Sequence, residues 1–314
     1  MNPAASLAFF GSLTIDDLVF ADGSTHWGVA GGNAAHAALG AALWSSQVSL
    51  VAPLGADYPV ETLHGRVDLA RCRPIGHTLR NWGLYEEDGH RHFVSRSSSR
   101  DWGAFCPTPA DAGTGRQIAA HVAPMPHAMA VELVQELRRL GTPTVSLDLD
   151  EHDLLQPANR EERLKLIRSV DLFLPSFQDV LSIFSASDPL QGLQQLRALA
   201  PEPLMIVIKC GKHGVIAHIR DTEEWIHVPA IDVLVADTTG AGDAFCGGLL
   251  ASYAEHRDPV ESLLAGVIAA SFCIEERGFT RLLSATTNEI DTRLDLLRPR
   301  IQRGRSVASR IAFQ

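Results

Sequence analysis

The residues best suited to chemistry lie at 240–243, inside the stretch VLVADTTGAGDAFCGGLL at 233–250. Apolar residues before this Gly-Ala-Gly-Asp group predict a strand, and those after it predict a helix. Glycine lets a ligand approach the backbone, and the first turn of a helix offers unpaired N–H groups and partial positive charge. Gly240, Ala241 and Gly242 are therefore expected to form an anion hole, which suits a phosphate or a phosphoryl group in transfer.

The carboxylate of Asp243 would lie in the same helical turn. It would stay ionised there and could take a proton from a hydroxyl nucleophile. The spacing alone is equally consistent with an ordinary helix start built from small residues and one acid. No GxxxxGK[ST] motif is present and the glycines are out of GxGxxG register, so neither a Walker A loop nor a dinucleotide-binding fingerprint is indicated.

The elements that must position this group follow from the hydrophobic pattern. Apolar runs predict strands at Leu7–Leu13, Gln47–Gly55, Thr144–Asp150, Val170–Ser176 and Leu204–Gly211. Apolar residues at helical spacing predict a helix over Ala128–Gly141. This alternation predicts an α/β fold with a mainly parallel sheet and helices on both faces.

Two stretches, about 15–30 and 77–100, interrupt the alternation. Asp22-Gly23 and Glu87-Asp88-Gly89 predict a hairpin turn in each. We expect the two stretches to form a small antiparallel sheet that acts as a lid. The length permits two domains, but one domain over 1–314 carrying this lid fits equally well and is the organisation we expect.

Composition excludes several classes of function. The net charge is −10, from 27 Lys and Arg against 37 Asp and Glu, which disfavours nucleic acid as a partner. The sequence has neither an 18-residue apolar run nor a basic segment before its first apolar run, so we expect no membrane association and a cytoplasmic location. Five scattered cysteines without a CxxC pair suggest neither a zinc site nor a disulfide framework.

The segment Asp237–Leu250 closely resembles the C-terminal signature of the ribokinase-like, PfkB-type sugar kinases. GGNAAHAALGAALW at Gly31–Trp44 resembles the Gly-Gly-Asn substrate segment of that family, and Gly55–Pro59 follows at the expected distance. The resemblance implies that Asp243 deprotonates the acceptor hydroxyl, which then attacks the γ-phosphate of ATP. The backbone of Gly240–Gly242 would steady the transferred group.

The resemblance also implies that the acceptor is bound by an aspartate just past the first strand. Asp16 matches that position, with Asp17 as a close competitor. Gly31, Gly32 and Asn33 would reach further hydroxyls of the acceptor. Asn33 is also a good helix N-cap, and the two roles are compatible.

Nucleotide contacts are implied for IKCGKHG at 208–214. Gly211 and Gly214 would allow a flat approach of the nucleotide. Lys209 stands where relatives often have a small hydroxyl residue, and it would either reach a phosphate or face solvent.

The clearest departure from the family pattern concerns the metal. Relatives carry Asn-x-x-Glu to organise Mg²⁺ and its waters, whereas this sequence has Ser176 and Asp179. Ser176 would lie beside the nucleotide, and Asp179 could still accept metal-bound water. Asp237 and Thr239 stand where many relatives bind a monovalent cation such as K⁺, although an ordinary turn would use the same residue types.

The sequence thus predicts a kinase that uses ATP and Mg²⁺ to phosphorylate a hydroxyl of a small sugar, or of a related polyol or nucleoside. Pairing of two lids in a homodimer is a further expectation. The alternative is a catalytically weak relative that serves as a metabolite-binding or regulatory protein, which the altered residues Ser176 and Asp179 would explain.

Overall fold

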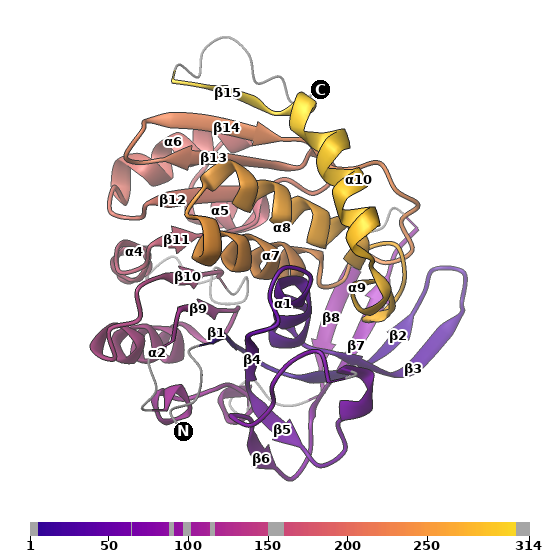
Figure 1. Ribbon diagram of the computed structural model, residues 1–314. Helices are drawn as coiled ribbons and strands as arrows, with labels where there is room; N and C mark the ends of the chain where they lie inside the picture. The colour runs from indigo at the N-terminus through magenta and orange to yellow at the C-terminus, as the bar shows by residue number, and fades with distance from the viewer. Residues whose placement is uncertain are drawn as a thin grey trace.

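A nine-stranded sheet forms the centre of the molecule, in the order β15-β14-β13-β12-β11-β10-β9-β1-β4 (Figure 1). The computed structural model describes residues 6–63, 65–87, 91–96, 102–113, 117–149 and 160–305. The strands of this sheet are β1 (Leu7–Phe10), β4 (Val48–Val51), β9 (Ala119–Val122), β10 (Val145–Leu147), β11 (Leu172–Phe173), β12 (Met205–Lys209), β13 (Val215–Ile219), β14 (Glu224–Val228) and β15 (Gln302–Gly304). The strands from β4 through β12 are parallel, and β13, β14 and β15 extend the sheet in antiparallel fashion.

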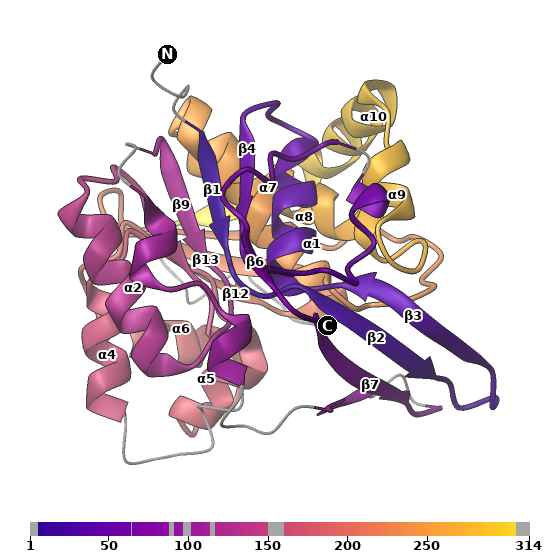
Figure 2. The same ribbon diagram turned by 90° about the horizontal axis from the view of Figure 1, so that it is seen from below.

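Helices cover both faces of this sheet. One face carries α1 (Asn33–Ala42), α7 (Ala241–His256), α8 (Pro259–Cys273), α9 (Thr280–Ser284) and α10 (Thr287–Leu297). The other carries α2 (His127–Arg139), α4 (Arg160–Arg168), α5 (Phe177–Ile183) and α6 (Pro189–Leu199), as Figure 2 shows. Each face has its own apolar core: Phe9 of β1 belongs to the first and Phe10 to the second. A strand buried on both sides has no polar face, which explains the continuous apolar runs of the sequence.

The short remaining elements lie in the connections. They are β5 (Pro53–Gly55) paired with β6 (Arg73–Ile75), and the 3₁₀ turns η1 (Val60–Leu63), η2 (Trp102–Phe105), η3 (Pro109–Ala112), η5 (Gly211–His213) and η6 (Arg298–Arg300). Among the described residues, no helix combines the length and the apolar character needed to cross a membrane.

A second sheet projects from the carboxyl end of β1 (Figure 2) and has the order β3-β2-β7-β8 (Figure 1). It consists of β2 (Thr14–Val19), β3 (Thr25–Gly31), β7 (Leu79–Tyr85) and β8 (Arg91–Ser95), and we call it the lid. Two antiparallel hairpins, β2–β3 and β7–β8, are joined by a parallel pairing of β2 with β7. Residues 88–90 and 97–100 of the expected lid lie outside the described residues.

The predicted fold class is confirmed, but one predicted strand is wrong. Residues 233–236, just before the Gly-Ala-Gly turn, have no regular structure, and Leu234 is 89% exposed. β14 already pairs with β13 and β15, so this apolar segment has no neighbouring strand to join. The helix predicted after the turn forms as α7.

Glycine lets α1 and α7 pack backbone to backbone. A Cβ atom at Gly247 would overlap the carbonyl of Ala37, and one at Gly40 would overlap the backbone of Ala244. The first turns of the two helices are also in contact, because the ring of His36 packs against Gly240. The packing of α1 on α7 therefore fixes the position of residues 31–33 relative to the turn at 240–243.

Candidate active site

The Gly-Ala-Gly turn has the geometry of an open helix start. Gly240 is the N-cap of α7 and lies in the left-handed region, at φ 75° and ψ −1°. Among the described residues no side chain caps this helix. Ala241 N donates to Thr238 O at 3.4 Å, and the remaining N–H groups of a first helical turn are those that can bind an anion. Asp243 lies in the first turn and is half-buried. The ring of His36 from α1 packs directly against Gly240, and a Cβ there would come within 2.5 Å of His36 Nε2.

Asp16 and Asp17 point to opposite faces of β2, as successive strand residues do. Asp17 accepts hydrogen bonds from Gly28 N at 2.9 Å and from Arg96 at 2.8 Å, which places it in the structure of the lid. Asp16 accepts from Asn81 Nδ2 at 2.9 Å and from Thr14 Oγ1 at 2.9 Å.

Asp16 is a buried carboxylate with a strongly shifted pKa. Burial raises its pKa to about 6 despite the opposing hydrogen bonds from Asn81 and Thr14, and the negative charge of Asp237 adds to the rise. A buried acid without a cationic partner is a common mark of a functional site.

Gly31, Gly32 and Asn33 lie beside Asp16. The Asp16 carboxylate occupies the space that a Cβ of Gly31 would need. Asn33 accepts a hydrogen bond from Ser12 N at 2.8 Å and donates one to Pro124 O at 2.7 Å, so its amide joins the ends of β1 and β9. The N-cap of α1 is Gly32, and the N-cap role considered for Asn33 is therefore wrong.

Lys209 ends β12 and points under the start of α7. Its ammonium donates to Asp148, which follows β10, and lies 3.7 Å from Cys246 Sγ of α7. Burial alone would lower the pKa of Lys209, but Asp148 and Cys246 outweigh it and hold the pKa above its usual value. Lys209 is therefore a buried cation, and the solvent-facing alternative is wrong.

Gly211 is the first residue of the η5 turn and Gly214 directly follows it, and both have positive φ. Gly214 also packs closely, because a Cβ there would overlap the carbonyl of Val228. The two glycines leave the backbone bare on either side of Lys212 and His213, close to the end of β12.

Ser176 and Asp179 form a capping box at the start of α5. Asp179 Oδ2 accepts from Ser176 N at 2.7 Å and from Ser176 Oγ at 2.6 Å, and Asp179 N donates back to Ser176 Oγ at 3.1 Å. Burial, together with the nearby charge of Asp148, raises the pKa of Asp179 to about 6. Ser176 forms a bridge with Lys209 in the neighbouring strand, so α5 begins beside the buried lysine.

These residues fit one mode of magnesium binding. The described residues contain no group of three or more His, Cys, Asp or Glu side chains that could enclose a metal. Mg²⁺ commonly keeps several waters and binds one or two carboxylates together with substrate phosphates. Asp179 suits such a water-mediated contact.

Asp237 and Thr239 contact the lid. Asp237 Oδ1 accepts from Thr239 N at 2.8 Å and from the Tyr85 hydroxyl at 3.0 Å, and that hydroxyl lies 2.5 Å from Thr239 Oγ1. Tyr85 belongs to β7, so a lid strand is joined to the segment that leads into the Gly-Ala-Gly turn. Nothing in the sequence indicates this contact, which joins residues 152 positions apart.

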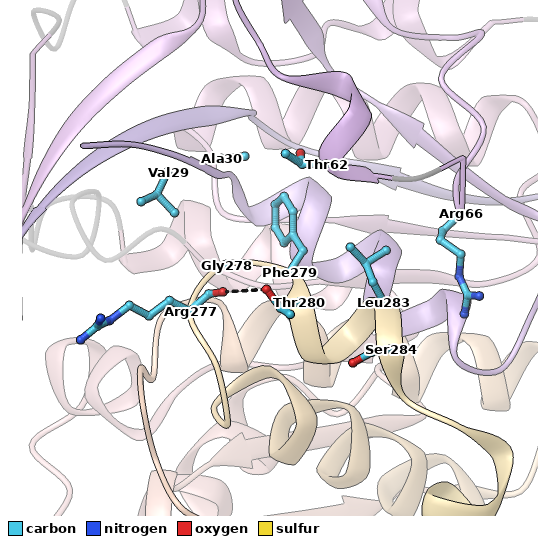
Figure 3. Close-up of a pocket in the computed structure, with 10 residues that line it drawn as sticks. All are labelled: Val29, Ala30, Thr62, Arg66, Arg277, Gly278, Phe279, Thr280, Leu283 and Ser284. Atoms are coloured by element: carbon cyan, nitrogen blue, oxygen red, sulfur yellow. Dashed lines mark hydrogen bonds between the residues drawn. The ribbon is translucent and has the colours of Figure 1, made fainter. Parts of the chain in front are cut away.

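A groove of about 630 Å³ lies apart from these residues, between β3 and α9 (Figure 3). Val29, Phe279 and Leu283 form its apolar part, and the guanidinium groups of Arg66 and Arg277 lie at its two ends. None of the predicted site residues lines it. Phe279 connects it to the site, because its ring lies 4.8 Å from that of His36.

The predicted residues lie on β2 and at the end of β3, which both continue from the carboxyl end of β1, at the carboxyl ends of β11 and β12, and at the starts of α1, α5 and α7. Such an edge of a parallel sheet is the usual place for a ligand. A family model described as pfkB family carbohydrate kinase matches residues 5–286. The chain belongs to the PfkB family. The predicted resemblance is confirmed, and this PfkB kinase is a phosphotransferase.

Relatives of this PfkB kinase cover most of its length. A cytidine kinase of Thermococcus kodakarensis is 28% identical over 284 residues, which are 87% of this chain and 97% of that protein. The structure of a fructokinase from Vibrio cholerae with fructose, ADP and calcium matches with a TM-score of 0.74 at 19% identity, over 93% of this chain and 100% of that one. A nucleoside kinase from Burkholderia thailandensis in complex with inosine matches with a TM-score of 0.71 at 20% identity, over 93% and 97% of the two chains. These two structures establish the shared fold.

Proposed function

We propose that this PfkB kinase transfers the γ-phosphate of ATP to a hydroxyl group of a small sugar, or of a related polyol or nucleoside. The observation that carries this proposal is the close packing of α1 against α7. It holds the acceptor segment at Gly31–Asn33 and the anion hole at Gly240–Gly242 side by side.

Asp243 takes the proton of the acceptor hydroxyl, and the resulting oxygen attacks the γ-phosphorus. The bond from that phosphorus to the bridging oxygen breaks, and ADP leaves with the electron pair. The N–H groups at Gly240–Gly242 stabilise the negative charge on the transferred phosphoryl group. Asp16 accepts hydrogen bonds from acceptor hydroxyls, because a carboxylate has lone pairs for two of them.

Ser176, Lys209, Gly211 and Gly214 form the nucleotide side of the proposed site. Mg²⁺, held through water by Asp179, would neutralise charge on the phosphates. A monovalent cation such as K⁺ is proposed beside Asp237. This carboxylate is 6% exposed and forms no ion pair within the described part of the chain, so a bound cation would offset its buried charge.

A direct test measures ADP release with a panel of sugars and nucleosides. We expect turnover with at least one acceptor, and the likeness to a cytidine kinase supports including cytidine. Asp243→Asn should abolish turnover, whereas Asp232→Asn, at an exposed acid in the same connection, should not. Binding of a sugar or nucleoside without any ADP release would instead support the metabolite-binding alternative.

We also propose that two lids pair in a homodimer. Large apolar side chains of the lid are exposed: Trp27 by 64%, Trp82 by 45%, Val94 by 44% and Leu84 by 38%. Trp82 and Val94 are direct cross-strand neighbours and share one face. Sedimentation of Trp82→Ser should show a monomer, and Leu296→Ser, at an exposed leucine on α10, should leave the dimer intact. A monomeric wild-type protein would refute this proposal.

A further inference from the structure

A buried lysine lies at the mouth of the anion hole. The Lys209 ammonium would be 3.2 Å from a Cβ built on Gly242, the last residue of the Gly-Ala-Gly turn. Its side chain is 12% exposed, and that of its partner Asp148 is 5% exposed. Cys246, one helical turn after Gly242, completes the cluster, with its Sγ 3.7 Å from Lys209 Nζ and 3.8 Å from Asp148 Oδ2.

This position is electrostatically unfavourable for a cation unless an anion is present. The start of a helix carries partial positive charge, which repels an ammonium group. Asp148 compensates, but burying such a pair gains little stability compared with apolar residues of similar volume. The fold therefore gives no strong reason to keep Lys209 here. An anion bound at Gly242 would be attracted by both the helix start and the ammonium.

We propose that Lys209 directly contacts the transferred phosphoryl group, and that Asp148 and Cys246 are positioning residues that hold its ammonium beside Gly242. This inference rests on the proposed function and adds a catalytic side chain to it. An ammonium group has three N–H donors. One is used by Asp148, a second lies near Cys246, and the third remains for a phosphoryl oxygen.

The role is purely electrostatic. Lys209 keeps its proton and forms no covalent bond, and the acceptor proton goes to Asp243 as described above. The ammonium stabilises charge that builds up on the phosphoryl oxygens as the bond to ADP breaks. The start of α5 cannot supply this charge, because the Asp179 carboxylate there is negative and already bound by Ser176.

The first test compares binding of ADP with binding of AMP-PNP, a non-hydrolysable ATP analogue, by calorimetry in the same magnesium buffer. Lys209→Met removes the charge and keeps most of the volume. We expect the affinity for AMP-PNP to fall by about 10- to 100-fold and the affinity for ADP to change by less than about 3-fold. Turnover should fall by roughly 100- to 1,000-fold. Lys165→Met, at an exposed lysine of α4, is the matched control and should match the wild type in each measurement.

The second test separates catalysis from folding. Lys209→Met leaves Asp148 buried without its cation and is expected to destabilise the protein, whereas Lys209→Met/Asp148→Leu replaces the pair by apolar residues and should recover the stability. We expect the double variant to lose the wild-type preference for AMP-PNP over ADP even though its stability is recovered. That result would show that Lys209 acts on the terminal phosphate. Asp148→Asn should lower kcat by about 10-fold while ADP affinity is retained.

Two results would overturn the inference. A Lys209→Met protein with wild-type preference for AMP-PNP and wild-type kcat would show that the pair is only structural. So would a double variant that regains both stability and turnover. In either case an inactive Asp243→Asn protein would leave the proposed function standing. A wild-type protein that binds no nucleotide would instead refute the proposed function, and this inference with it.

Discussion

Replacing Gly240 by alanine gives a sharp test of the anion hole. Gly240 has φ 75°, a conformation that side chains disfavour, and its would-be Cβ position is taken by the His36 ring. Two separate penalties therefore apply, one from backbone conformation and one from crowding. The crowding would also move the N–H groups that we propose bind the phosphoryl group.

The expected magnitude follows from the two penalties. A left-handed conformation costs an L-residue about 1–2 kcal/mol. Inserting a methyl group into a packed site costs about 1–3 kcal/mol more. We therefore expect Gly240→Ala to lower the free energy of unfolding by about 2–5 kcal/mol. A shift of about 1 Å in the anion hole should lower kcat by roughly 100-fold.

Gly141→Ala is the matched control. Gly141 has φ 72°, close to the value at Gly240, but no atom of the described residues lies within 4 Å of a Cβ built there. It should show only the conformational penalty and a normal kcat. Urea denaturation of both variants, with ADP release measured on the same samples, makes the comparison.

The His36 ring provides the decisive check. If crowding against it is the cause, Gly240→Ala/His36→Ala should be more stable than the sum of the single variants predicts, by about 1–3 kcal/mol. The reasoning is refuted if Gly240→Ala matches Gly141→Ala in both stability and kcat.

Three further predictions concern the acids of the site. The pKa of Asp16 is about 6 in the folded protein, against an ordinary value of 3.8. Between pH 3.8 and pH 6 the folded protein therefore binds more protons than the unfolded chain does. The free energy of unfolding should fall as the pH rises through this range, by at most about 3 kcal/mol. Asp16→Asn should then be more stable than the wild type at pH 8 in thermal denaturation yet lose acceptor binding in calorimetry, and a variant with unchanged stability at pH 8 would contradict this. Asp243→Asn should keep nucleotide affinity within about 3-fold and lower kcat at least about 100-fold in coupled ADP assays, the range expected for general base catalysis; near-normal turnover would remove this residue from the role. Exchanging potassium for tetramethylammonium should lower kcat severalfold through Asp237, and equal rates in both salts would end the cation proposal.

Much of the fold could be predicted, because strands that are buried on both faces of a parallel sheet appear in the sequence as continuous apolar runs. The strands predicted at Leu7–Leu13 and Leu204–Gly211 contain β1 and β12, and the helix predicted at Ala128–Gly141 is α2. β9 could not be predicted in the same way. Its sequence, Ala119–Val122, contains two alanines and a histidine, which are poor strand formers, and it is a strand because β1 and β10 flank it.

The start of α7 after the Gly-Ala-Gly turn could be predicted, because the residues that define it at 240–243 are consecutive. Contacts between distant segments could not. Asp148 directly follows a predicted strand, but nothing in the sequence indicates that it meets Lys209, 61 residues later. The choice between Asp16 and Asp17 also needed the structure, because only the direction of each side chain from β2 decides it.

The glycine contact between α1 and α7 has a consequence for how new acceptors could be accommodated. Two helices that touch through bare backbone cannot slide or tilt without collision, so the gap between acceptor segment and phosphoryl site is invariant. Among the described residues, no glycine contact of this kind joins the lid strands β2, β7 and β8 to α7. Substitutions on those strands can therefore change which acceptor binds. They would leave the position of the acceptor segment relative to the phosphoryl site unchanged.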